Sequence, residues 1–118
     1  MAKNILLICK NPADLTKRRA TLEDAGYKVT GLTDEEQALN LLSQNHYDAV
    51  ILGNTMSGEK RNQLNRRVKI ATPETPVVVI MHEGERDGLA DAVVTNPKNP
   101  HALLETLMGM FASHSLEQ

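Results

Sequence analysis

The sequence predicts an α/β fold: a doubly wound, five-stranded parallel sheet with helices on both faces, in three α/β/α layers. Three short apolar runs without alternation, Ile5–Ile8, Ala49–Leu52 and Val77–Ile80, are typical of strands buried on both faces. Amphipathic segments separate these runs, as the crossovers between parallel strands require. The chain has 118 residues, of which 41% are hydrophobic, and this suits one domain with one core.

The first crossover is predicted to be a helix from Ala13 to Ala25. Asn11 and Pro12 end the first strand, and proline suits the first turn of a helix. Gly26 follows at the position that the carboxyl end of a helix favours. The segment 27–30 alternates apolar and polar residues and predicts an edge strand.

The second crossover is predicted to begin with a capping box formed by Thr33 and Glu36. In this arrangement the threonine hydroxyl accepts from an amide three residues on, and the glutamate reaches back. Ala38, Leu41 and Leu42 then form the buried stripe of the helix. We therefore expect this helix to lead into the strand at Ala49.

A third helix is predicted over 59–70, a fifth strand over 92–95, and a last helix from Asn99 and Pro100. The last helix has an apolar stripe made by Leu103, Leu104, Leu107, Met108 and Phe111. Only residues 82–91 separate the fourth strand from the fifth, so the helix in that crossover is predicted to be shortened. We expect an ordered core over 3–112 and a tail over 113–118.

Several classes of protein are excluded by what the sequence lacks. No apolar run approaches the length of a membrane span, and the first residues do not match a signal peptide, so we expect a cytoplasmic protein. Cys9 is the only cysteine, which excludes an internal disulfide and a cysteine-based zinc site. No two histidines lie four residues apart, and we expect neither a metal nor another cofactor.

Five stretches, in this order and spacing, carry a resemblance that covers nearly the whole chain: Lys3–Pro12, Leu22–Tyr27, Tyr47–Gly53, Thr75–Ile80 and Asp91–Pro97. The chain resembles the receiver domain of two-component response regulators, which has a flavodoxin-like fold. The resemblance implies chemistry at the carboxyl ends of the strands. In receivers, two acids there help to hold Mg²⁺, and an aspartate after the third strand accepts a phosphoryl group from a histidine kinase.

The resemblance places six residues at the positions that carry the receiver switch. These are Cys9 and Lys10 (acidic pair), Gly53 (phosphoacceptor), Met81 (threonine or serine), Val93 (rotating aromatic) and Asn96 (lysine). Gly53 has no carboxylate to form an acyl phosphate, and Cys9 and Lys10 offer Mg²⁺ no oxygen ligand. The chain is therefore predicted to be a degenerate pseudo-receiver and not an enzyme.

The same pocket has an alternative use as a binding site for a small molecule or an anion. Lys10 would supply the charged contact, and Asn11, Asn54, His82 and Thr95 would supply polar contacts. Against this, asparagine and glycine also serve ordinary turns. Cys9 has two interpretations as well: Lys10 could lower the pKa of its thiol, or the cysteine is a small hydrophobe.

Two surfaces are candidates for docking a protein partner. Residues 59–69 carry five basic side chains against one acid, and Arg61, Arg66 and Arg67 would form a basic face for an acidic partner. A shortened fourth crossover would uncover Met110 and Phe111 for a partner or a second copy of the chain. The simpler interpretations are a solvated charged face and a buried helix stripe.

The predicted function is a stand-alone receiver-like domain in signal transduction that acts as a phosphorylation-independent protein-interaction module. The expected partner is a signalling protein, with a homodimer as a further arrangement. Nucleic acid is not expected, because the net charge is −2 and only 3% of the residues are aromatic. A membrane partner is not expected either.

Overall fold

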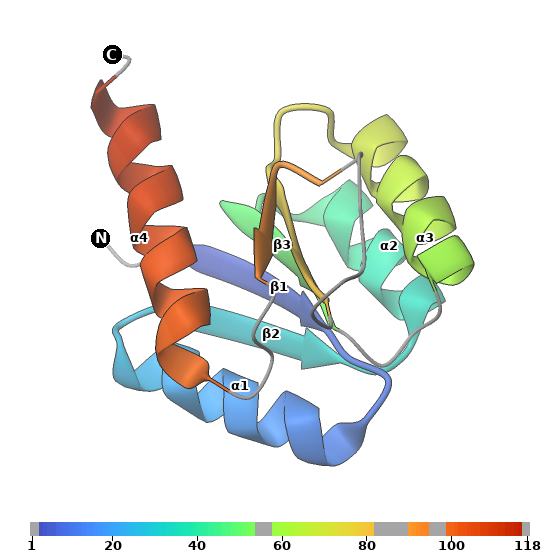
Figure 1. The fold of residues 1–118 in the computed structure, drawn as a ribbon. Helices are drawn as coiled ribbons and strands as arrows, with labels where there is room; N and C mark the ends of the chain where they lie inside the picture. Colours follow the sequence, from blue (N-terminus) through green and yellow to red (C-terminus); the bar gives the residue numbers. More distant parts are fainter. Residues whose placement is uncertain (1–2, 54–57, 82–89, 95–98, 117–118) are drawn as a thin grey trace.

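A parallel sheet of five strands forms the centre of the molecule (Figure 1). The structure is a computed structural model that describes residues 3–53, 58–81, 90–94 and 99–116. The strands are β1 (Asn4–Ile8), β2 (Lys28–Leu32), β3 (Ala49–Leu52), β4 (Val77–Ile80) and β5 (Ala92–Val94). Their spatial order is β2-β1-β3-β4-β5, and every neighbouring pair is parallel, as predicted. The segment between β4 and β5, where a shortened helix is predicted, includes 82–89 and lies outside the described residues.

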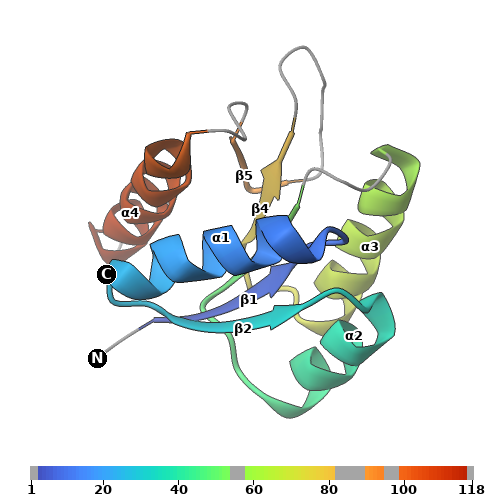
Figure 2. The same cartoon turned by 90° about the horizontal axis from the view of Figure 1, so that it is seen from below.

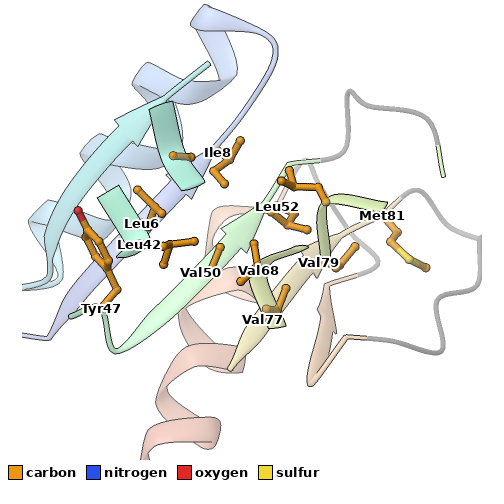
Figure 3. Close-up of a cluster of buried hydrophobic side chains, with 12 residues drawn as sticks. Leu6, Ile8, Leu42, Tyr47, Val50, Leu52, Val68, Val77, Val79 and Met81 are labelled. Atoms are coloured by element: carbon orange, nitrogen blue, oxygen red, sulfur yellow. The ribbon is translucent and has the colours of Figure 1, made fainter. Parts of the chain in front are cut away.

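Helices cover both faces of the sheet, which confirms the three predicted layers (Figure 2). The helices are α1 (Pro12–Asp24), α2 (Glu35–Gln44), α3 (Gly58–Ala71) and α4 (Pro100–Leu116). Side chains that alternate along β1 enter two apolar clusters. Leu6 and Ile8 pack with α2 and α3, as Figure 3 shows, while Ile5 and Leu7 pack with α1 and α4. Both faces of the sheet are therefore buried, as the unbroken apolar runs predict.

The ends of α1 follow the predicted signals. The Asn11 side chain accepts from the amides of Ala13 and Asp14 at 2.8 and 3.3 Å, and Pro12 occupies the first turn. Gly26 follows the helix with a φ of 99°, a left-handed conformation that glycine adopts without steric cost.

The capping box predicted at Thr33 is wrong, because the cap of α2 is the next residue. The Asp34 carboxylate accepts from the amides of Glu36 and Gln37 at 2.8 and 3.4 Å. A carboxylate offers the same acceptor as a hydroxyl and adds a charge that the helix dipole favours. Aspartate therefore takes the cap position ahead of the neighbouring threonine.

The other boundaries differ from prediction at the ends of elements. β2 lies at a sheet edge as predicted but runs from Lys28 to Leu32. Tyr27 precedes it and places its ring 6.0 Å from that of Phe111, centroid to centroid. α4 continues to Leu116, so the tail predicted from residue 113 is helical as far as that residue. Met108, predicted to belong to the buried stripe, is 64% exposed.

Two aspartates tie neighbouring strands together at the amino edge of the sheet, where the strands begin. Asp48 precedes β3, and its Oδ2 accepts from the first amide of β1, that of Asn4, at 2.7 Å. Asp91 precedes β5, and its Oδ2 accepts from the amide of Val77 in β4 at 2.7 Å. In each pair the aspartate amide also donates to the carbonyl of the same partner residue. The two carboxylates thus fix the register of both strand pairs.

An ion pair between α2 and α3 makes one pH-dependent prediction. Arg67 donates two hydrogen bonds to the Glu36 carboxylate, at 2.8 and 3.2 Å. These bonds, and then the arginine charge, hold the pKa of Glu36 below its usual range. A depressed folded-state pKa adds stability above the unfolded pKa, and that stability is lost as the pH falls through the folded pKa. The pair is exposed, so we expect the effect on unfolding to be small.

The measurement is a carboxyl-carbon NMR titration of Glu36 in the parent chain and in Arg67→Ala. We expect the Glu36 pKa to rise toward its ordinary value in the variant. Equal titration midpoints in the two proteins would contradict the ion pair.

Candidate functional site

The carboxyl ends of β1 and β3 bring Cys9 and Gly53 together. The Gly53 amide donates to the Ile8 carbonyl at 2.8 Å, and both Cys9 and Gly53 are buried. A Cβ atom added to Gly53 would lie 2.9 Å from the Cys9 Sγ and 3.3 Å from the Ile8 carbonyl oxygen. The thiol therefore fills the space into which a side chain at position 53 would project.

A cation reaches the same place from α1. The Arg18 guanidinium donates from Nη1 to the Cys9 Sγ at 3.6 Å, and that nitrogen would lie 3.2 Å from a Cβ on Gly53. The sequence interpretation did not single out this residue. A signal was available, because Arg18 lies three residues after Leu15 and four before Leu22, on the helix face that packs against the sheet.

The Cys9 thiol is a core group rather than an activated nucleophile. Burial raises its pKa, and the hydrogen bond and charge of Arg18 offset this only in part. The charges that act on the pKa of Cys9 are those of Arg18 and Asp14, and not that of Lys10, which one of the two interpretations had invoked. The interpretation of Cys9 as a small buried hydrophobe fits this site.

We expect two consequences for Cys9 chemistry. In the folded protein the thiol should react with Ellman's reagent far more slowly than in urea, because its side chain is fully buried. Replacing Arg18 with glutamine should raise the pKa of Cys9 further, as followed by thiolate ultraviolet absorbance. Fast labelling of the folded chain, or a Cys9 pKa that falls in Arg18→Gln, would contradict this geometry.

Two predicted pocket residues are used elsewhere. The Lys10 Nζ lies 3.2 Å from the Glu35 Oε1 at the start of α2, and the lysine side chain is 41% exposed. Asn11 uses its side-chain oxygen to cap α1. Each of these two side chains therefore already has a structural partner.

The remaining predicted positions are partly described. Met81 is buried and belongs to the apolar cluster drawn in Figure 3, and Val93 packs against the same cluster. Both are packing residues of the sheet. Four others, Asn54, His82, Thr95 and Asn96, lie outside the described residues. Of the predicted pocket, the structure thus places Cys9 and Gly53 together and adds Arg18.

The basic run of α3 is only partly exposed. Arg61 is only 2% exposed, and its Nη2 lies 3.7 Å from where a Gly58 Cβ would stand, so the side chain folds back along its own helix. Arg67 is paired with Glu36. Arg66 is exposed and is the one predicted docking arginine that keeps this surface role available.

Met110 and Phe111 are also less open than predicted. Both are partly buried and pack against the cluster between α4 and the sheet. The Lys3 Nζ lies over the Phe111 ring, 5.1 Å from its centroid, and forms a cation–π contact. Among the residues whose burial is described, the exposed large apolar side chains are instead Met108, at 64%, and Ile70, at 82%.

Among the residues that the structure describes, no group of three or more histidine, cysteine, aspartate or glutamate side chains is placed to hold a metal ion. In the same part of the chain, no helix is both long and apolar enough to cross a membrane.

Comparisons with known proteins place the fold. No family model and no curated protein matches the chain. Solved structures do match. A CheY-like response regulator receiver domain protein from Methanospirillum hungatei JF-1 has a TM-score of 0.85 at 19% identity, over 100% of both chains. The chemotaxis protein CheY4 of Vibrio cholerae has a TM-score of 0.80 at 23% identity, over 92% of this chain and 98% of the other.

A third match is a receiver domain from a sensor kinase. The receiver domain of the sensor histidine kinase PA1611 from Pseudomonas aeruginosa PAO1 has a magnesium ion coordinated in its active-site cleft. It has a TM-score of 0.75 at 21% identity, over 89% of this chain and 93% of that domain. The chain therefore has the CheY-like receiver fold, as the resemblance implies.

Proposed function

We propose that this chain is a receiver-like signalling domain that acts through protein contacts without being phosphorylated. The observation that carries the proposal is Gly53 at the end of β3, with the Cys9 thiol and the Arg18 guanidinium in the space beside it. The resemblance to receivers assigns this position to the phosphoacceptor. Glycine has no side chain on which a phosphoryl group can form an acyl phosphate.

The surrounding groups are equally unsuited to Mg²⁺, which takes hard oxygen ligands. The positions that the resemblance assigns to the acidic pair hold a thiol, at Cys9, and an ammonium group, at Lys10. Arg18 adds a positive charge within 3.6 Å of that thiol. A divalent cation entering here would meet repulsion from the arginine and no carboxylate from these residues.

The proposal assigns the chain no enzymatic activity and no cofactor. Its partner is another signalling protein, and nucleic acid is disfavoured because the net charge is −2. The packing of Met81 and Val93 supports this assignment, since both positions serve the core.

The test is exposure to a small-molecule phosphodonor. The purified chain is incubated with acetyl phosphate and Mg²⁺, beside the CheY4 receiver as a positive control, and intact masses are measured. We expect no mass change in this chain. A gain of one phosphoryl group that hydroxylamine removes would overturn the proposal, because that lability identifies an acyl phosphate.

The Arg18 guanidinium favours a second candidate, an anion-binding role for the same edge of the sheet. Guanidinium groups bind carboxylate and phosphate with paired hydrogen bonds. Arg18 rather than Lys10 would supply the charge, because Lys10 is paired with Glu35. Inorganic phosphate should then raise the melting temperature of the parent chain and not that of Arg18→Gln. Equal melting temperatures with and without phosphate would rule this candidate out.

A further inference from the structure

A cavity of about 860 Å³ lies at the amino edge of the sheet, opposite to Gly53. One wall is the part of α4 from Glu105 to Phe111, and the other is the turn 73–76 between α3 and β4. Figure 1 shows α4 and this turn on different sides of the strand starts. The residues that precede the strands, Lys3, Asp48 and Asp91, form its base. We call this cavity the amino-edge groove. Its volume is in the range of ordinary ligand sites.

The charge of the amino-edge groove is acidic. Its lining holds the carboxylates of Asp48, Glu74, Asp91 and Glu105. Two lysines oppose these four groups and leave a net charge of −2. Lys69 is bound to Asp91 at 2.6 Å and to the Thr75 carbonyl at 2.8 Å, so its charge is already matched inside the groove.

Glu74 and Glu105 are the carboxylates of the groove that are most accessible to a ligand. Both are exposed, and within the described part of the chain neither forms an ion pair. Asp48 and Asp91, by contrast, already accept from strand amides. A cation entering the groove would therefore meet the two glutamates, one on each wall.

The rest of the lining is mixed. His46, Thr75 and Thr106 are polar, and the Lys3 Nζ lies 5.1 Å from the centroid of the Phe111 ring. Met110 and Phe111 of α4, Ala92 of β5 and Pro76 contribute carbon and sulfur surface beside the carboxylates. Methionine adapts its shape to varied apolar side chains. The groove thus places an apolar surface next to two acidic walls.

Gly109 gives a separate reason to regard the groove as a site. It lies within the 17-residue helix α4, where glycine costs about 1 kcal/mol relative to alanine. A Cβ there would meet no atom within 4 Å, so packing inside this chain does not require glycine. Gly109 lines the groove, and its missing side chain keeps the α4 wall open to an occupant.

From this geometry we propose that the amino-edge groove binds a peptide segment of a partner protein in which lysine or arginine stands beside an apolar side chain. The basic group pairs with Glu74 and Glu105, and the apolar side chain packs on Met110 and Phe111. The inference rests on the proposed function in taking the partner to be a protein. Because the groove is at the edge opposite to Gly53, binding there requires no phosphorylation.

The test uses a capped synthetic peptide of alternating arginine and leucine as the probe. Two control peptides replace arginine by glutamate, or leucine by serine. Binding to the full chain is followed by amide NMR shifts. We expect shifts confined to residues that line the groove, such as Asp48, Glu74 and Glu105. Both control peptides should bind at least about tenfold more weakly, a difference of about 1.4 kcal/mol.

Variants separate the groove from general acidity. Glu105→Lys and Glu74→Lys reverse one charge on each wall, and Gly109→Trp fills the groove. Glu59→Lys makes the same charge change on α3 near the opposite edge and serves as the matched control. We expect at least about tenfold weaker peptide binding in the first three and unchanged binding in the control. Amide spectra of each variant report whether it is folded.

Several results would overturn the inference. These are shifts spread over the whole acidic surface, equal binding of the serine peptide, or an equal loss in Glu59→Lys. Self-association that Gly109→Trp abolishes would assign the groove to a second copy instead. The phosphodonor assay is independent. If the mass stays unchanged and the peptide does not bind, only the inference about the groove is rejected. If the chain is phosphorylated and the peptide binds normally, only the proposed function is rejected.

Discussion

Replacing Gly53 with alanine is expected to lower the free energy of unfolding by about 2 kcal/mol, as extra atoms in a packed core do. The new Cβ would stand 2.9 Å from the Cys9 Sγ and 3.3 Å from the Ile8 carbonyl oxygen. Cys9 is fully buried, so its Sγ can move aside only by displacing packed neighbours. Urea unfolding of the two proteins measures the change.

A double-mutant cycle identifies the cause. Cys9→Ala removes the Sγ atom that a Cβ at position 53 would approach too closely. In that background, Gly53→Ala should lower the free energy of unfolding much less. The coupling free energy should be about 1 kcal/mol or more. Additive effects would contradict the close approach of the two residues.

Gly109→Ala is the matched control for this substitution. It is the same chemical change, but the new methyl group would meet nothing within 4 Å. Since alanine favours a helix over glycine, we expect the free energy of unfolding to rise by about 0.5–1 kcal/mol. A loss of stability at Gly109 would show that the two glycines are not distinguished by their surroundings.

Asp91→Ala is expected to cost about 2 kcal/mol of unfolding free energy, because it leaves a strand amide without its acceptor. The Asp91 carboxylate accepts from the Val77 amide at 2.7 Å and pairs with Lys69 at 2.6 Å. Thermal or urea unfolding measures the loss. Asp91→Asn keeps an acceptor oxygen and should lose less.

Asp48→Ala provides an internal comparison. Asp48 makes the same bond to the Asn4 amide, but its second contact is to His46, with the Nε2 and Oδ1 atoms 3.5 Å apart. We expect Asp48→Ala to lower the free energy of unfolding by somewhat less than Asp91→Ala does. Stability unchanged in both variants would contradict the view that these carboxylates secure the amino edge of the sheet.

Much of the fold was predictable because strands buried on both faces leave a strong pattern. The runs Ile5–Ile8, Ala49–Leu52 and Val77–Ile80 are buried throughout in the structure. Boundaries were less certain where adjacent residues have similar chemistry. Thr33 and Asp34 can both cap a helix, and the charge of the aspartate favours it at the cap position.

The site was less predictable because its long side chains contact residues of other helices and strands. Lys10 reaches Glu35, and Arg18 reaches Cys9 across the gap between helix and strand. Arg61 was predicted to form part of a basic docking face, yet its side chain is buried. The periodicity of apolar residues predicts which face of an element a Cα atom occupies, but it does not predict where the end of a long side chain such as arginine lies.

The amino-edge groove had no signature in the sequence. Its lining comes from segments far apart in the chain, from Lys3 to Phe111, that only the fold brings together. Met110 and Phe111 were singled out for a partner surface, and both line this groove. The two exposed acids of the groove, Glu74 and Glu105, lie in a turn and on a helix. Glutamates in such places are usually solvated, so the sequence did not mark them as part of a site.

We propose that the carboxyl edge of the sheet does not act as a phosphoryl switch. The most direct measurement is an amide NMR titration with Mg²⁺, followed by Mg²⁺ with beryllofluoride, which mimics the phosphoryl group. We expect no shifts at Cys9, Gly53 and Met81 in either step. Saturable shifts localised at these residues would show a working ion or phosphoryl site and would contradict the pseudo-receiver account.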